Sequence, residues 1–312
     1  MAPTEAPSIT FDQAAAAYVK TNAAGWRNSK HTAQWTSTLK TYASPIFGSR
    51  SVADIDRPAV LKVIEPIWAT KSETASRLRG RIEAILDWAA VMGYRSGDNP
   101  ARWKGHLDKV LPAQNKVKKV THHKALPYEE VPAFMVTLRD QLGIAAQALQ
   151  FTILTAGRTT EILESRWSEI DIAKKVWTVP AARMKADRIH RVPLTAAAIA
   201  ALPPQGNAGE ADLIFAHSST GRSLSENAMT AVLKRMGVDA TVHGFRSSFR
   251  DWAAEKTDHG GDAAELALAH AVGGKVRTAY QRGDLLEKRR LLMKDWANYI
   301  LKAQSTLSRG AR

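Results

Sequence analysis

Six residues in the second half of the chain have side chains that bind phosphate or transfer protons. In chain order they are Arg158, Lys185, His243, Arg246, His270 and Tyr280. Arginines neutralise and orient a phosphate and stabilise the charge that builds on its oxygens in a transition state. Lysine and histidine can protonate a leaving oxygen or accept a proton. A tyrosine hydroxyl, with an ordinary pKa near ~10, becomes a nucleophile beside positive charge. Together these six residues supply the groups needed to transfer a phosphodiester to a tyrosine.

The arginines and the first histidine each have a plainer interpretation when taken alone. Arg158 precedes Glu161 by three positions, a spacing typical of an ion pair on one helix face. His243 and Arg246 share a helix face by the same spacing, but two basic residues on a surface helix can do so incidentally. We expect Gly244, which lies between them, to let a phosphate approach the backbone of a helix N-terminus.

The last two residues of the set differ in their surroundings. His270 follows the apolar stretch Leu266–Leu268, where a single histidine is usually a core residue. Tyr280 is followed by Gln-Arg-Gly-Asp, a polar context that suits a reactive hydroxyl. The other tyrosines lie in apolar or capping contexts and are predicted to be packing residues: Tyr18, Tyr42, Tyr94, Tyr128 and Tyr299.

Composition restricts the chemistry and indicates the partner. The 312 residues include no cysteine, which excludes disulfides and thiolate metal sites and suits a reducing cytoplasm. We find no metal-binding motif, no signal peptide and no apolar run long enough to span a membrane. The net charge is +14. Residues 1–120 contain 18 Lys and Arg against 10 Asp and Glu, and the remainder contains 26 against 20. Both halves are basic, so a polyanion that contacts both is the natural partner.

The first part of the chain has helical patterns. Residues 1–8 are rich in Pro and Ala and are predicted to be disordered. Thr10 and Gln13 are placed for a capping box. Further helices are expected over His31–Tyr42 and from Pro58 to Trp68. The clearest covers Ser72–Met92, where apolar residues recur at helical spacing before Gly93. Residues 9–108 therefore read as a small helical domain.

A second domain is predicted after a basic segment. Residues 109–124 are dense in Lys and His and lack apolar periodicity, so we expect an extended linker. Residues 125–312 combine helical patterns with three short strand-like stretches, Ile170–Ile172, Val176–Val179 and Arg191–Leu194. The fold class is mainly α with a small antiparallel sheet. Lys185 would lie at the tip of the hairpin formed by the last two strands.

Four strings resemble the tyrosine recombinase family, and specifically the P4-like phage and prophage integrases. They are TAGRTTEILESRWSEIDI, VWTVPAARMKADRIHRVPL, HGFRSSFRDWAAE and ELALAHAVGGKVRTAYQRGDLLEKRR, in the family's order over roughly 150 residues. The resemblance implies a site-specific recombinase that cuts and rejoins DNA through a 3′-phosphotyrosyl intermediate, without cofactor or metal.

The resemblance also assigns roles. Arg158 and Arg246 resemble the arginines that clamp the phosphate, and Lys185 looks like the hairpin lysine that protonates the leaving 5′ oxygen. His243 resembles the residue that assists proton transfer with the tyrosine. The remaining assignments are a phosphate contact for His270, the nucleophile for Tyr280 and a supporting acid for Glu161.

By the same resemblance, residues 9–108 are similar to a core-site DNA-binding domain. Charge pattern alone suggests DNA contacts, and a solvated basic face explains it equally well. The candidates are Arg77 and Arg81, four apart on one helix, together with Lys30, His31 and the hairpin residue Arg183. P4-like integrases usually begin with an arm-site-binding domain, and we expect this chain to lack it.

The implied partners are double-stranded DNA attachment sites and three further copies of the chain in a tetramer on DNA, formed from free monomers. Host DNA-bending and excision factors are further expected partners, and a bacterial cytoplasmic, nucleoid-associated location is expected. Two other interpretations remain open: a type IB topoisomerase, and an inactive prophage remnant that only binds DNA. The segment Asp284–Lys302 is predicted to be a helix that packs either on its own domain or on a neighbouring protomer.

Overall fold

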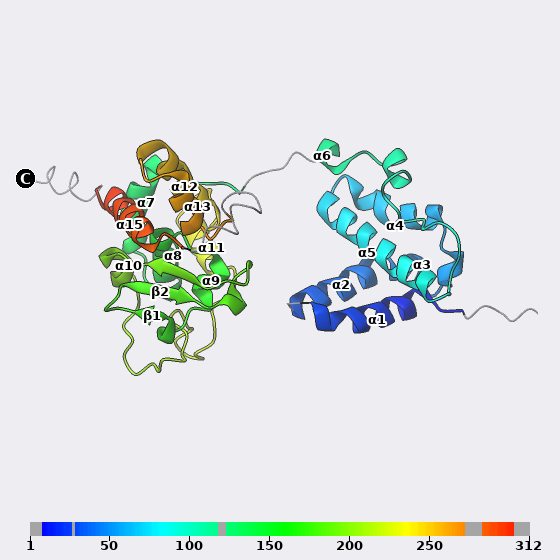
Figure 1. Ribbon diagram of the computed structural model, residues 1–312, viewed down its shortest axis with the longest axis horizontal. Helices are drawn as coiled ribbons and strands as arrows, with labels where there is room; N and C mark the ends of the chain where they lie inside the picture. The colour runs from blue at the N-terminus through cyan, green and yellow to red at the C-terminus, as the bar shows by residue number, and fades with distance from the viewer. Residues whose placement is uncertain (1–7, 27–28, 118–122, 272–282, 303–312) are drawn as a thin grey trace, which may run out of the picture. The chain divides into compact units, whose positions relative to one another are not determined.

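The computed structural model describes residues 8–26, 29–117, 123–271 and 283–302, which divide into two compact units, Met1–Thr121 and His122–Arg312 (Figure 1). The first is helical, and the second combines helices with one small sheet. No helix within the described ranges is long and apolar enough to cross a membrane. The predicted fold class is confirmed.

The first unit consists of short helices around one apolar core. Thr10 and Gln13 form the predicted capping box, since Thr10 Oγ1 accepts from the Gln13 amide and the Gln13 side chain accepts from the Thr10 amide. The elements are α1 (Phe11–Asn22), η1 (Ala23–Gly25), α2 (Ser29–Tyr42), α3 (Ser44–Phe47), η2 (Val52–Asp54), α4 (Arg57–Trp68), α5 (Ser72–Val91), η3 (Leu107–Lys109) and α6 (Gln114–Val117).

Helix α5 forms the centre of this core. Its predicted apolar stripe is fully buried at Leu78, Ile82 and Ile85, and the stripe packs against α4. Gly93 follows the helix with a φ of 76°, a left-handed conformation that glycine adopts without strain. The Tyr94 amide then bonds to the Ala89 carbonyl at 2.9 Å, which closes the helix end.

The prediction of an extended linker over residues 109–124 is wrong for its described parts. Leu111 is buried in the first core, and the Trp68 indole donates to the Pro112 carbonyl at 2.9 Å. Helix α6 follows. At the other end, the Lys124 carbonyl accepts from the Thr241 amide at 2.9 Å in the second unit. Composition suggested a solvated segment because its few apolar anchors lie among many lysines.

The second unit surrounds the nearly fully buried helix α8 (Ile144–Thr155), which packs against α7, α9, α10, α11 and α15. Figure 1 shows the sheet strands β1 (Ile170–Asp171) and β2 (Val176–Val179) beside these helices. The other elements are η4 (Tyr128–Glu130), α7 (Val131–Arg139), α9 (Thr159–Leu163), η5 (Trp167–Glu169), η6 (Ala181–Arg183), α10 (Ala196–Ala200), α11 (Ala228–Arg235), α12 (Gly244–Lys256), α13 (Gly261–Ala267) and α15 (Leu286–Leu301).

The sheet is antiparallel in the order β1–β2–β3, with β1 at Ile170–Asp171, β2 at Val176–Val179 and β3 at His190–Pro193. Val179 pairs with His190, so the connection that carries Lys185 leaves β2 and returns directly to β3 as predicted. Trp177 of β2 is fully buried against Phe151 of α8, which ties the sheet to the helical core.

The C-terminal helix α15 packs on its own unit, against α7, α13 and β3. Trp296 is fully buried and donates its indole N–H to the Ile153 carbonyl of α8 at 2.9 Å. The sequence left open whether this helix packs on its own domain or on a neighbouring protomer, and in this structure it packs on its own unit.

Gly244 has a different role from the predicted one. A Cβ at Gly244 would lie 2.1 Å from the Lys124 carbonyl oxygen and 2.8 Å from Ala125 Cα. The space beside this glycine is thus filled by the chain's own backbone, which leaves no room for a phosphate there. The glycine allows the entry segment of the second unit to pack against the start of α12.

We predict that Gly244→Ala lowers the free energy of unfolding by about 1–3 kcal/mol, because the backbone that would clash cannot rotate away as a side chain can. Urea unfolding of the full chain, followed by tryptophan fluorescence, measures the change. Gly261→Ala is the matched control, since a Cβ there meets nothing within 4 Å. Equal midpoints for the two variants would contradict the packing role.

Candidate active site

Arg158 lies at the turn between α8 and α9. Its backbone amide donates to Glu161 Oε2 at 3.1 Å, and its Nη1 donates to Glu161 Oε1 at 2.7 Å. Glu161 is itself only 4% exposed. Arg158 Nη2 donates to the carbonyls of Leu268 and Ala269, at 3.1 and 3.2 Å. The ion pair expected as the plainer interpretation exists, but the same guanidinium also reaches the end of α13.

Arg246, on the first turn of α12, is buried beside Arg158. Its Nη1 donates to the Ala156 carbonyl, and its Nη2 donates to the Leu268 carbonyl at 2.6 Å. Burial, followed by the charge of Arg158, lowers the pKa of Arg246 to about 10, so the side chain stays charged at neutral pH. Among the described residues, no group accepts from the buried Arg246 Nε. Two cations that share one carbonyl form a site for an anion.

His270 follows α13 and faces Arg246, with 3.4 Å between its Nε2 and Arg246 Nη2. Its Nδ1 lies 2.7 Å from Glu265 Oε2, and Glu265 Oε1 accepts from Arg250 Nε at 2.7 Å. The side chain of His270 is 42% exposed, so it is no core residue. A carboxylate on Nδ1 fixes the ring and directs Nε2 toward the arginines. Sequence reasoning missed Glu265.

His243 is exposed at the N-cap of α12, and its ring centroid lies 4.8 Å from that of His123. Partial burial, followed by the charges of Arg246, His123, Arg158 and His270, lowers the pKa of His243 below its ordinary value. The imidazole is therefore neutral at pH 7 and able to accept a proton.

The structure brings the predicted Arg158, His243, Arg246, His270 and Glu161 together. Lys185 is exposed on the connection between β2 and β3. Tyr280 lies outside the described residues, so the proposed nucleophile stays a prediction. Among the described residues, no group of three or more acidic or histidine side chains is arranged to hold a metal ion.

His190, at the start of β3, is a further titratable residue that sequence reasoning missed. Burial, followed by the charge of Arg289, lowers its pKa to about 4, and Arg158 and Arg246 also contribute. His190 is therefore a neutral residue close to the cationic cluster. In the sequence it only precedes the predicted strand Arg191–Leu194.

A charged network holds the chain just after the position of Tyr280. Asp284 accepts from Arg191 at 2.7 and 2.9 Å and from Arg289 Nη2 at 2.8 Å. Arg289 is 1% exposed and also donates to the Arg191 carbonyl at 2.5 Å. Partial burial raises the pKa of Asp284, but the hydrogen bond from Arg191 and the charges of both arginines outweigh this and lower it. The network fixes the start of α15 to β3.

Two of the predicted DNA contacts are held by partners within the protein. Arg81 is only 7% exposed, and its guanidinium donates to the Gln34 carbonyl at 2.8 Å and lies over the Trp35 ring. Arg183 pairs with Glu169 and donates to the Glu161 carbonyl at 3.3 Å. Both arginines are satisfied by the protein, because a buried guanidinium must find acceptors.

The other candidate DNA contacts remain predictions. Arg77 is 64% exposed and pairs with Glu73 on the same helix. His31 is exposed, and its Nε2 accepts from the Trp35 indole at 3.2 Å. Lys30 lies in α2, and the structure does not describe its side chain.

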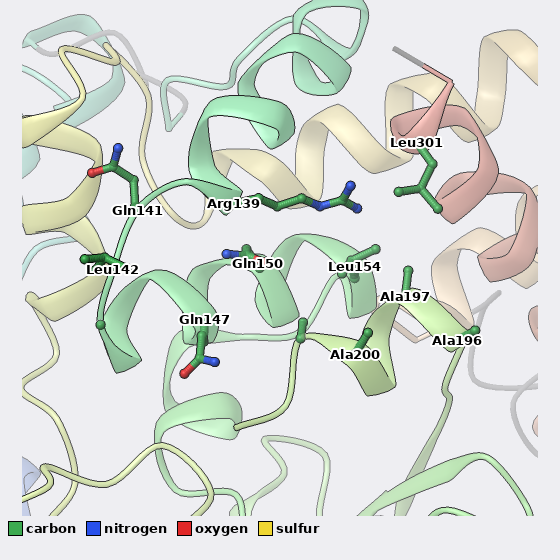
Figure 2. A pocket seen from close by; sticks show the side chains of 12 residues that line it. Arg139, Gln141, Leu142, Gln147, Gln150, Leu154, Ala196, Ala197, Ala200 and Leu301 are labelled. Atoms are coloured by element: carbon green, nitrogen blue, oxygen red, sulfur yellow. The ribbon is translucent and has the colours of Figure 1, made fainter. Parts of the chain in front are cut away.

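A pocket with a volume of about 740 Å³ lies elsewhere in the second unit (Figure 2). Its lining comes from the ends of α7 and α15 and from α8 and α10, and includes Arg139, Gln147, Gln150 and Leu301. It contains none of the clustered arginines or histidines, so the candidate chemistry lies outside it.

Comparison with known proteins agrees with both units. The profile of the family described as phage integrase central domain matches residues 11–106, and that of the phage integrase family matches residues 124–282. Prophage integrase IntZ of Escherichia coli K12 is 32% identical over 93% of this chain and 71% of its own length. The integrase of Enterobacteria phage P4 is 30% identical over 84% of this chain, which spans 63% of that protein.

A solved structure has the same fold. The lambda integrase tetramer bound to a Holliday junction matches with a TM-score of 0.66 at 17% identity, covering 86% of this chain and 79% of that one.

We predict that Asp284→Asn lowers the free energy of unfolding by about 1–3 kcal/mol, because it removes the carboxylate from the buried Arg289. The side chain of Asp284 is 37% exposed, so water screens part of the loss. Because its folded-state pKa is lowered, the stabilisation is complete above the unfolded value near ~4 and is lost as pH falls through the folded one.

Urea titrations at neutral and acidic pH measure this effect. Asp295→Asn, within α15, is the matched control, since Asp295 is 51% exposed and pairs with His259 at the surface. A difference between wild type and Asp284→Asn that grows at acidic pH would count against the network.

Proposed function

Since this chain belongs to the phage integrase family of tyrosine recombinases, we propose that it integrates and excises a mobile element by cutting and rejoining DNA through a 3′-phosphotyrosyl link at Tyr280. The observation that carries the proposal is the pair Arg158 and Arg246, which share the Leu268 carbonyl as an acceptor, while the Nε of Arg246 has no acceptor among the described residues. A phosphodiester is the anion such a pair accepts.

In the proposed first step, the Tyr280 oxygen attacks phosphorus and the bond from phosphorus to the 5′ oxygen breaks. Arg158 and Arg246 neutralise the charge that builds on the non-bridging oxygens. Lys185 gives a proton to the leaving 5′ oxygen, and neutral His243 accepts the tyrosine proton. His270, oriented by Glu265, donates from Nε2 to the phosphate. A 5′-hydroxyl of a second strand then reverses these bond changes, so no cofactor is consumed.

Recombination between two duplexes cuts and rejoins four strands, and therefore we propose a tetramer on DNA. The structure of lambda integrase as a tetramer bound to a Holliday junction supports this assembly. The proposed DNA partners are attachment sites in a bacterial nucleoid. Host bending and excision factors would set the direction of the reaction.

We predict that the chain forms a covalent adduct with a nicked duplex and that Tyr280→Phe forms none. The duplex is first selected by the protein from a random library, then nicked beside the cut so that the freed 5′-hydroxyl fragment dissociates. An adduct stable to detergent on a gel is the readout. Tyr299→Phe is the control, since Tyr299 packs against Trp252 and Trp296.

The adduct assay separates the proposal from its alternatives. An adduct in Tyr280→Phe would disprove the nucleophile, and none with wild type would favour a protein that only binds DNA. Joining between two selected duplexes, compared with relaxation of a supercoiled circle, distinguishes a recombinase from a topoisomerase.

We predict that the single-turnover rate of adduct formation falls at acidic pH with a midpoint below ~6.5, because the lowered pKa keeps His243 neutral above it. His243→Gln should remove this acidic limb and lower the plateau by roughly 10²-fold. His259→Gln, whose ring pairs with Asp295 outside the arginine cluster, should keep the limb. An unchanged limb in His243→Gln would assign the proton transfer to another group.

A further inference from the structure

Arg183 lies two residues before Lys185, at the end of η6. Its side chain is 17% exposed, and its Nη2 forms an ion pair with Glu169 Oε2. Its Nη1 donates to the Glu161 carbonyl at 3.3 Å. The guanidinium is thereby held by two acceptors within the protein.

Glu169 is a firm anchor for this arginine. Its side chain is 10% exposed, and its Oε2 also accepts from the Trp177 indole at 3.0 Å. Trp177 is fully buried on β2. A carboxylate held by a core tryptophan has little freedom, so the arginine that pairs with it is fixed as well.

The chain changes from buried to exposed at Lys185. Met184, directly before it, is 6% exposed and belongs to the apolar core. Residues 185–189 are all exposed. Two consecutive anchors, one ionic and one apolar, thus hold the connection immediately before the lysine.

Arg183 also contacts Glu161, the residue that holds the proposed phosphate-binding Arg158. The Glu161 carbonyl that accepts from Arg183 belongs to the residue whose carboxylate holds Arg158 at 2.7 Å. One short hydrogen-bonded path therefore joins the lysine segment to the arginine that would bind the phosphate.

We propose that Arg183 and Glu169 are a positioning pair, which sets the point from which Lys185 protonates the leaving 5′ oxygen relative to the phosphate held by Arg158. This inference rests on the proposed function, because it takes Lys185 as the general acid. Lysine at position 183 cannot replace the arginine, since a single ammonium does not span the carboxylate and the carbonyl as a planar fork does.

The test replaces the leaving 5′ oxygen by sulfur in the selected suicide duplex. With oxygen, the bond from phosphorus to O5′ breaks and Lys185 supplies the proton. With sulfur, the corresponding bond to S5′ breaks and the thiolate leaves with the electron pair. A thiol has a pKa near ~8.5, far below that of an alcohol, so the thiolate needs no proton donor.

We expect Arg183→Ala and Glu169→Gln to slow adduct formation on the oxygen duplex by roughly 10–100-fold, as a misplaced catalytic group does. On the sulfur duplex, both should match wild type within about threefold, because the misplaced acid is no longer needed. Glu169→Gln keeps an acceptor for Trp177 and is the milder change, so it carries the test if Arg183→Ala does not fold.

Lys185→Ala separates this inference from the proposed function. If sulfur does not restore Lys185→Ala, Lys185 is not the general acid and the proposed mechanism fails. If sulfur restores Lys185→Ala but leaves Arg183→Ala and Glu169→Gln slow, the positioning role is wrong.

DNA affinity over a range of salt provides the second readout. A lost phosphate contact reduces the slope of log affinity against log salt by about 1. Arg183→Ala should keep the wild-type slope. A reduced slope would show that Arg183 contacts a DNA phosphate and would contradict the positioning role.

Discussion

The structure of the site depends on holding two guanidinium groups together despite their like charge. Arg158 and Arg246 both donate to the Leu268 carbonyl. Their other backbone acceptors are the Ala156 and Ala269 carbonyls, which also lie at helix ends. Carbonyls at a helix C-terminus carry partial negative charge and have no partner within the helix. The ends of α8 and α13 therefore supply the negative potential that keeps both cations in place without filling the site.

This arrangement explains two backbone features. Ala156 and Ala269 have φ values of 50° and 49°, the left-handed region that costs a residue with a Cβ about 1–2 kcal/mol. Each alanine directs its own carbonyl at an arginine. The charge-assisted hydrogen bonds offset the strain. Two carboxylates complete the support, since Glu161 holds Arg158 and Glu265 holds His270.

Local patterns predicted local features well. The apolar spacing of Ser72–Met92 predicted a helix, and α5 ends one residue earlier. The interval between Val176–Val179 and Arg191–Leu194 predicted the hairpin. Side chains whose role depends on distant partners were missed, or their partners within the protein were not foreseen. Arg289 donates to the carbonyl of Arg191, which lies 98 positions earlier in the chain. The charge pattern of Arg77 and Arg81 could not show which of the two faces the core.

The same long-range contacts restrict the segment that carries Tyr280. On one side, His270 is held by Glu265 through its ring and through its backbone amide, at 2.7 and 2.9 Å. On the other side, Asp284 is held by Arg191 and Arg289. Tyr280 precedes Asp284 by four residues, and an extended chain spans at most about 3.6 Å per residue. Covalent geometry alone thus keeps the tyrosine Cα within roughly 14 Å of that anchor. Arg191, which binds this anchor, belongs to the strand that follows Lys185, so a single hydrogen-bonded framework limits where the proposed nucleophile and the proposed acid can act.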